Sequence, residues 1–142
     1  MSRHDIALVA GTRPEVVKMA PVYFALRESA KLRPIFVSTG QHRQMLDQTL
    51  AVFGIQPEHD LNLMQHGQTL PDLTARVLTA TTAWLAEHKP AAVLVQGDTT
   101  TVLASAMAAF YQRIPIGHVE AGLRTGNMMS PWPEAVSYTH LT

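Results

Sequence analysis

The segment from residue 91 to residue 124 constrains the fold of this chain more than any other part of its sequence. Ala91–Val95 is a short apolar run bounded by turn residues, which is typical of a strand buried on both faces. Thr100–Tyr111 is rich in alanine and apolar all round, so we expect a helix packed closely on a sheet. Pro115–Val119 is then a second strand. A strand, a helix and a strand in this order predict a parallel pair with a right-handed crossover.

Apolar runs and helical spacing predict the same alternation along the rest of the chain. The sequence therefore favours an α/β fold, with a Rossmann-like, mainly parallel sheet and helices flanking it. The further expected elements are strands at Ile6–Ala10, Ile35–Ser38 and Leu61–Met64, and helices at Pro14–Arg27, Gln44–Phe53 and Leu70–His88.

The first helix has a well-defined start in the sequence. Thr12 and Glu15 have the spacing of a capping box, and Pro14 suits the first helical turn. Pro21 lies further along and is expected to bend the helix or to loosen one backbone hydrogen bond. At the end of the second helix, Gly54 is expected to stop the helix.

Composition excludes several classes of protein. The 142 residues suffice for about one domain, and 46% hydrophobic residues suffice for a core. Eleven basic and eleven acidic residues balance, so neither a nucleic acid nor an anionic membrane is an expected partner. The chain has no cysteine, no apolar run of about 20 residues for a membrane helix, and too short an apolar amino terminus for a signal peptide. We expect a cytoplasmic protein.

Two carboxylates follow the two strands of the central segment, at the edge of an open parallel sheet where ligands bind. Asp98 stands in the turn Gly97–Thr99 and also suits an ordinary helix cap. Glu120 directly follows Val119, so it is expected to face a cleft and to serve as a general acid or base. His118 shares a strand face with Glu120, either as its acid–base partner or as a satisfied structural histidine.

Arg13 and Lys18 form a candidate anion site at the start of the first helix. Free backbone N–H groups and the helix dipole favour an anion there, and arginine adds a bidentate clamp. Two solvated surface cations are the alternative, and both interpretations stay open. The loop lacks the glycine patterns of dinucleotide and P-loop ATP sites.

Other polar residues give weaker indications. Gln41–Arg43 follow the second strand, where an ordinary loop before a helix is the favoured interpretation. Glu134 alone would be surface charge. His59 and His66 do not have metal-ligand spacing, so we expect neither a metal site nor a cofactor.

Several segments, in this order and at this spacing, are similar to a known family. The sequence resembles the non-hydrolysing bacterial UDP-N-acetylglucosamine 2-epimerases from the first strand to residue 134. The segments that carry the resemblance are Gly11–Pro21, Gln41–Gln48, Gly97–Thr101, Gly117–Gly126 and Ser130–Glu134.

The resemblance implies a two-domain fold of the glycosyltransferase-B type, of which this chain is the amino-terminal half. It implies an active site between the domains that interconverts UDP-N-acetylglucosamine and UDP-N-acetylmannosamine without metal or nicotinamide. The chemistry is anti elimination of UDP to a 2-acetamidoglucal, then re-addition with inverted C2. The product feeds cell-envelope polysaccharides, and the full-length protein is expected to be a homodimer.

The resemblance also implies roles for individual residues. The expected catalytic carboxylates are Asp98, Glu120 and Glu134. The expected substrate-binding residues are Arg13, Lys18, His118 and Arg124. Part of a second, regulatory UDP-N-acetylglucosamine site is expected at Gln41, His42, Arg43 and Gln44.

The chain also departs from the family. The family is more than twice as long, so residues 1–134 are expected to be an incomplete amino-terminal domain, inactive alone. Residues 135–142 do not follow the family pattern, and Val136–Leu141 can be translated from a transposon end used in sequencing adaptors. We therefore expect an artefactual tail. A stand-alone nucleotide-sugar-binding module and a glycosyltransferase-like domain are the alternative functions.

Overall fold

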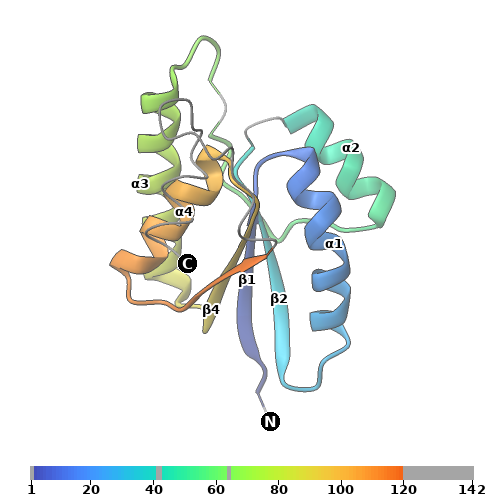
Figure 1. The fold of residues 1–142 in the computed structure, drawn as a ribbon. Helices are drawn as coiled ribbons and strands as arrows, with labels where there is room; N and C mark the ends of the chain where they lie inside the picture. Colours follow the sequence, from blue (N-terminus) through green and yellow to red (C-terminus); the bar gives the residue numbers. More distant parts are fainter. Residues whose placement is uncertain (1, 41–42, 64, 120–142) are drawn as a thin grey trace, which may run out of the picture.

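A computed structural model describes residues 2–40, 43–63 and 65–119. Within them, every pair of neighbouring strands is parallel, in the order β3-β2-β1-β4-β5, with helices on both faces (Figure 1). The predicted α/β class is confirmed. The elements are β1 (His4–Ala10), α1 (Arg13–Arg27), β2 (Leu32–Ser38), α2 (Arg43–Phe53), β3 (His59–Asp60), α3 (Leu70–His88), β4 (Ala92–Gln96), α4 (Thr100–Tyr111) and β5 (Ile116–Val119).

The strand order contains one reversal of direction. The chain moves outward from β1 to β2 and β3, and then returns to place β4 on the other side of β1. The carboxyl ends of β1 and β4 are therefore adjacent while their following helices lie on opposite faces. Ligands of open α/β sheets bind at such a switch point.

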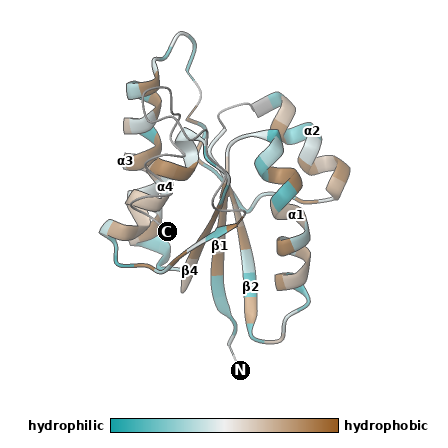
Figure 2. Ribbon diagram, viewed as in Figure 1, coloured by the Kyte–Doolittle hydropathy of each residue, from teal (hydrophilic) through white to brown (hydrophobic). Residues whose placement is uncertain are grey.

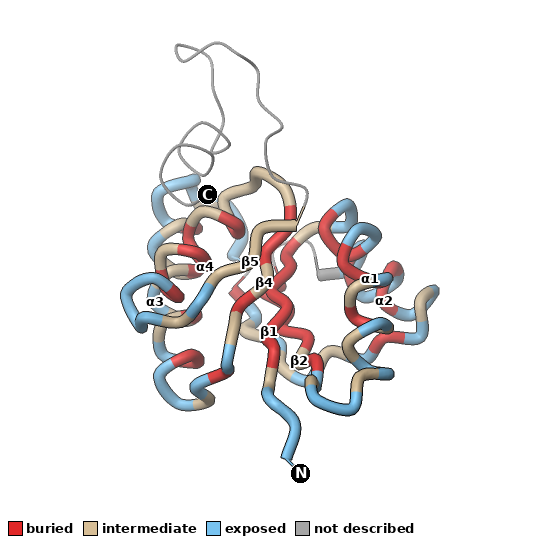
Figure 3. Tube along the Cα trace, turned by 60° about the horizontal axis from the view of Figure 1, so that its bottom comes forward, coloured by how far each residue is buried: buried red, intermediate tan, exposed pale blue. Residues whose placement is uncertain are grey.

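Each face of the sheet has its own core, with α1 and α2 over one face and α3 and α4 over the other (Figure 1). In β1, Ile6 and Leu8 pack with α1 and α2, whereas Ala7 and Val9 pack with α3 and α4. All four side chains are buried, because a central parallel strand is covered on both faces. Figure 2 shows the apolar strands between the two helix layers, and Figure 3 shows long buried stretches in β1 and β2.

The helix boundaries confirm most of the sequence predictions. α1 starts directly after Thr12, and it continues through Pro21 to Arg27. α2 ends before Gly54, whose φ of 68° is the left-handed conformation that stops a helix. None of the helices in the described ranges is long and apolar enough to cross a membrane.

The position of the expected strand at Leu61–Met64 is wrong. The structure instead has β3 at His59–Asp60, paired with the end of β2. Asn62 has a φ of 51°, outside the extended region, so the ladder with β2 cannot continue through it. Met64 lies outside the described residues.

Candidate functional site

Two predicted site residues lie in adjacent loops at the switch point. Arg13 follows the loop after β1, and Asp98 lies in the loop after β4. Because β1 and β4 pair in parallel, with Leu8 opposite Leu94, both loops emerge at the same edge of the sheet. Arg13 is exposed and Asp98 is partly exposed. The structure therefore brings a cation and a carboxylate to one edge, whereas the sequence analysis pairs Asp98 with Glu120 and Arg13 with Lys18.

A buried carboxylate connects these two loops. Glu15 is only 1% exposed, and its Oε2 accepts hydrogen bonds from the amides of Gly11 and Thr12, both at 2.7 Å. Its Oε1 accepts a short hydrogen bond from the hydroxyl of Thr99, 84 positions away in the sequence. One side chain thus holds the start of α1 against the start of α4.

The surroundings of Glu15 act on its protonation in opposite directions. Burial raises the pKa of Glu15, because the charged form loses its hydration. The hydrogen bonds from Thr99, Gly11 and Thr12 lower the pKa but do not cancel the effect of burial. The sequence indicates Glu15 only as the acidic member of a capping box. Its contact with Thr99 depends on the strand order, which no local pattern reveals.

Two amides at the expected anion site are already hydrogen-bonded. The sequence interpretation treats the amides at this turn as free for an anion, but the amides of Gly11 and Thr12 already donate to Glu15. The side chains of Arg13 and Lys18 at this edge are both exposed. Their binding role stays a prediction.

His118 lies on β5 and contacts the loop after β4. Its Nε2 is 2.6 Å from the carbonyl oxygen of Gly97, which can only accept, so Nε2 donates this hydrogen bond. Its Nδ1 is buried and has no hydrogen-bond partner within the described residues. The contact supports the structural interpretation of His118, and its expected partner Glu120 lies outside the described residues.

Several predicted site residues cannot be placed in this arrangement. Gln44 is exposed at the start of α2, and the side chain of Arg43 is not described. Within the described ranges, no three His, Asp or Glu side chains lie together as a metal site would need. The predicted residues outside the described ranges are Gln41, His42, Glu120, Arg124 and Glu134.

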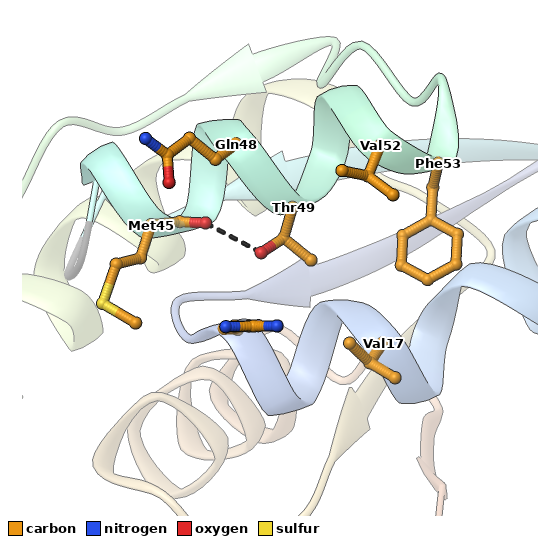
Figure 4. A pocket seen from close by; sticks show the side chains of 7 residues that line it. Val17, Met45, Gln48, Thr49, Val52 and Phe53 are labelled. Atoms are coloured by element: carbon orange, nitrogen blue, oxygen red, sulfur yellow. Dashed lines mark hydrogen bonds between the residues drawn. The ribbon is translucent and has the colours of Figure 1, made fainter.

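A hollow of about 330 Å³ lies between α1 and α2 and was not expected from the sequence (Figure 4). Met45 is 53% exposed and Val52 is 83% exposed, so apolar side chains line an open surface. The hydroxyl of Thr49 donates to the carbonyl of Met45 at 2.8 Å. The lining residues are Arg13, Val17, Met45, Gln48, Thr49, Val52 and Phe53.

Comparison with known proteins gives one consistent result. The family described as UDP-N-acetylglucosamine 2-epimerase matches residues 24–138. The UDP-N-acetylglucosamine 2-epimerase of Escherichia coli (strain K12) is 55% identical over 134 residues, which is 94% of this chain. That match covers 36% of the Escherichia coli protein, so the chain spans about one third of this relative's length.

Solved structures agree with the sequence comparison. A crystal structure of a UDP-N-acetylglucosamine 2-epimerase superposes with a TM-score of 0.89 at 47% identity, over 96% of this chain and 38% of that one. The enzyme from Neisseria meningitidis, solved bound to UDP-GlcNAc, gives 0.85 at 48% identity, over 93% and 36%. The sheet and helices described above are therefore the amino-terminal part of a larger architecture.

Proposed function

Because this chain belongs to the UDP-N-acetylglucosamine 2-epimerase family, we propose that it forms the amino-terminal domain of an enzyme that interconverts UDP-N-acetylglucosamine and UDP-N-acetylmannosamine. The single structural observation that carries the proposal is the placement of Arg13 and Asp98 in adjacent loops at the switch point. The bound UDP-GlcNAc of the Neisseria meningitidis relative supports the choice of ligand.

The chemistry needs a base, an acid and a cation at one edge. A base takes the proton from C2 of the sugar, the C1–C2 double bond forms, and the bond between C1 and UDP breaks. UDP leaves with that electron pair and then adds back to C1, while an acid delivers a proton to the opposite face of C2. Asp98 is one of the carboxylates proposed for proton transfer, with Glu120 and Glu134 as the others.

The basic residues suit the leaving group. As UDP departs, negative charge accumulates on its diphosphate, and cations fixed near that position stabilise the transition state. Arg13 and Lys18 lie on the first turns of α1 at the same edge as Asp98. We assign them to the diphosphate or the neighbouring sugar, and His118 and Arg124 to the substrate.

The remaining expectations belong to the same proposal. A homodimer of the full-length protein, a cytoplasmic location and a regulatory nucleotide-sugar site at Gln41–Gln44 rest on the family resemblance. The hollow between α1 and α2 is lined in part by α2, the helix that contains Gln44. Its lining residue nearest in sequence to Gln44 is Met45. This neighbourhood is compatible with a second ligand near the start of α2.

A chimaeric enzyme tests the proposal. Residues 1–134 of this chain would replace the matching segment of the Escherichia coli relative, which supplies the remaining length. We expect the chimaera to exchange the C2 proton of UDP-N-acetylglucosamine with deuterated water and to form the 2-epimer, both followed by NMR. The unmodified Escherichia coli enzyme is the control for the added part.

The alternatives give different results in the same experiment. Binding of UDP-N-acetylglucosamine without C2 exchange would favour the binding module. Transfer of the sugar to an added acceptor would favour a glycosyltransferase. A folded chimaera that neither binds nor exchanges would contradict the proposed function.

A further inference from the structure

We propose that Glu15 is a positioning residue, which fixes the Arg13 loop against the Asp98 loop in the geometry that the reaction needs. The inference rests on the proposed function for its catalytic consequence. The structural part, a link between two loops through one carboxylate, stands on the hydrogen bonds alone.

The hydrogen bonds around Glu15 all end on its two carboxyl oxygens. The amides of Gly11 and Thr12 donate to Oε2, and the hydroxyl of Thr99 donates its one proton to Oε1. The same hydroxyl accepts from the amide of Val102 at 3.4 Å, as the cap of α4. The chain of donors therefore runs from α4 through Thr99 to the carboxylate, where it meets the donors from α1.

Glu15 makes a contact beyond its own capping box. In a capping box, the acidic side chain reaches back to the amide of the cap residue of its own helix. Glu15 does so for Thr12, but it uses its second oxygen for a contact with another helix. Removing the carboxylate would therefore loosen two loops at once, although it lies in only one of them.

The positions beside the link are those proposed for function. Arg13 directly follows Thr12, and Asp98 directly precedes Thr99. A displacement of about 1 Å in reacting groups lowers an enzyme's rate by about 10²-fold. Any shift between the loops moves Arg13 relative to Asp98, so the link acts on the reaction through these residues.

A matched control lies at the start of α3. Thr69 and Asp72 form a capping box there too, with the amide of Asp72 donating to the hydroxyl of Thr69 at 3.3 Å. This box is exposed, and α3 begins after the β3 loop rather than at the switch point. An Asp72→Asn change therefore weakens a capping box without touching the two loops.

The test uses the chimaeric enzyme with four variants. We expect Thr99→Val to lower kcat about 10-fold and Glu15→Ala, which removes both carboxylate oxygens, to lower it about 10²-fold, with KM changed less than threefold. Thr99→Ser keeps the hydroxyl, so it should retain kcat within about twofold. Asp72→Asn should lower the melting temperature but leave kcat unchanged. All rates are measured where circular dichroism shows each variant folded.

A double-mutant cycle adds a stricter requirement. Glu15→Ala combined with Thr99→Val should lose no more activity than Glu15→Ala alone, because both changes remove the hydrogen bond between the two side chains. Additive losses would mean that Thr99 and Glu15 act separately. Full kcat in Thr99→Val, or equal losses in Asp72→Asn, would overturn the inference.

A measurement on the 142-residue chain separates this inference from the proposed function. In amide NMR spectra, Thr99→Val should shift the resonances of Gly11 and Thr12, whereas Thr99→Ser should leave them near their original positions. Unchanged resonances in Thr99→Val would reject the link, whatever the activity. If the amides shift but the unmodified chimaera shows no C2 exchange, the proposed function fails, and the catalytic role of Glu15 fails with it.

Discussion

A carboxylate lies near each end of the central strand β1, Asp5 within the strand and Glu15 in the following helix α1, and the two are held in opposite ways. At the amino end, Asp5 lies opposite Arg33 of β2 and receives two hydrogen bonds from its guanidinium, at 2.7 and 2.9 Å. This pair is open to solvent. At the carboxyl end, Glu15 is buried and is held by two amides and a hydroxyl.

The two environments shift protonation in opposite directions. The hydrogen bond from Arg33 holds the pKa of Asp5 below its usual value, whereas burial raises the pKa of Glu15. At the amino end, both the solvent and the guanidinium of Arg33 therefore stabilise the charged form of the carboxylate. At the carboxyl end, burial disfavours the charged form of the Glu15 carboxylate. Buried groups with shifted pKa values are enriched at functional sites. The contrast predicts that changes at the carboxyl end affect function and those at the amino end do not.

The largest expected effect is on turnover. In the chimaeric enzyme, Asp98→Asn should lower C2 exchange about 10³-fold, since it removes a group proposed to transfer a proton. Asp5→Asn, at the other end of the sheet, should leave the rate within about twofold. Proton exchange in deuterated water, followed by NMR, measures both. Equal rates for the two variants would remove the functional difference between the ends.

The next effect is on stability and compares two glycines. Gly40 follows β2 at the carboxyl end, with a φ of 73°, and an added Cβ would lie 3.1 Å from the Cα of Asn62. Gly54 follows α2, has a φ of 68°, and has no atom within 4 Å of an added Cβ. Gly40→Ala should cost about 2–3 kcal/mol in unfolding free energy, and Gly54→Ala about 1 kcal/mol.

Urea unfolding of the 142-residue chain checks the two glycine variants. Equal losses of unfolding free energy would show that the strain of a left-handed backbone alone accounts for the cost of both substitutions. A larger loss at Gly40 would show that the carboxyl-end loops are also closely packed against each other.

A smaller effect concerns pH. Because the pKa of Glu15 is raised above its ordinary 4.5, its contribution to stability is complete below that value and is lost as the pH rises through the raised pKa. Glu15→Gln removes this dependence. As the pH rises, the wild type should therefore lose stability relative to the variant. Urea unfolding at several pH values measures this. A difference that stays constant would contradict the shift.

The smallest effect belongs to the exposed pair, and its pH dependence has the opposite sign. The pKa of Asp5 is lowered, so its contribution is present above the ordinary value of 3.8 and is lost as the pH falls through the lowered pKa. Asp5→Asn should lower the unfolding free energy less than Gly40→Ala does. Added salt should shrink the difference in unfolding free energy between the wild type and Asp5→Asn. A loss that resists 1 M salt would show that Asp5 acts by packing.

Local sequence patterns predict the elements of this fold well, because each depends on residues close together in the chain. The capping box of Thr12 and Glu15 and the stop at Gly54 are examples. The position of β3 was not predictable, since it depends on how the chain after β2 pairs with Ser38. The bond between Glu15 and Thr99 depends in turn on the order of the strands.

The site follows the same rule. Arg13 and Asp98 are recognisable from their places after apolar strands, and in the structure their loops lie at one edge of the sheet. Glu15 was recognisable only as a cap, because nothing near it in the sequence indicates Thr99. Site residues that follow a strand can thus be found from the local sequence. A residue such as Glu15, which acts through a contact distant in the sequence, cannot.

The separation of 84 positions between Glu15 and Thr99 also orders the folding of the chain in time. On a ribosome, β1 and β2 are synthesised and can pair long before β4 emerges, so one edge of the central strand waits unpaired. Pairing over such a distance is slow, because a long loop must close first. The two loops of the candidate site therefore come together only when β4 docks, which makes the site one of the last parts of the domain to form.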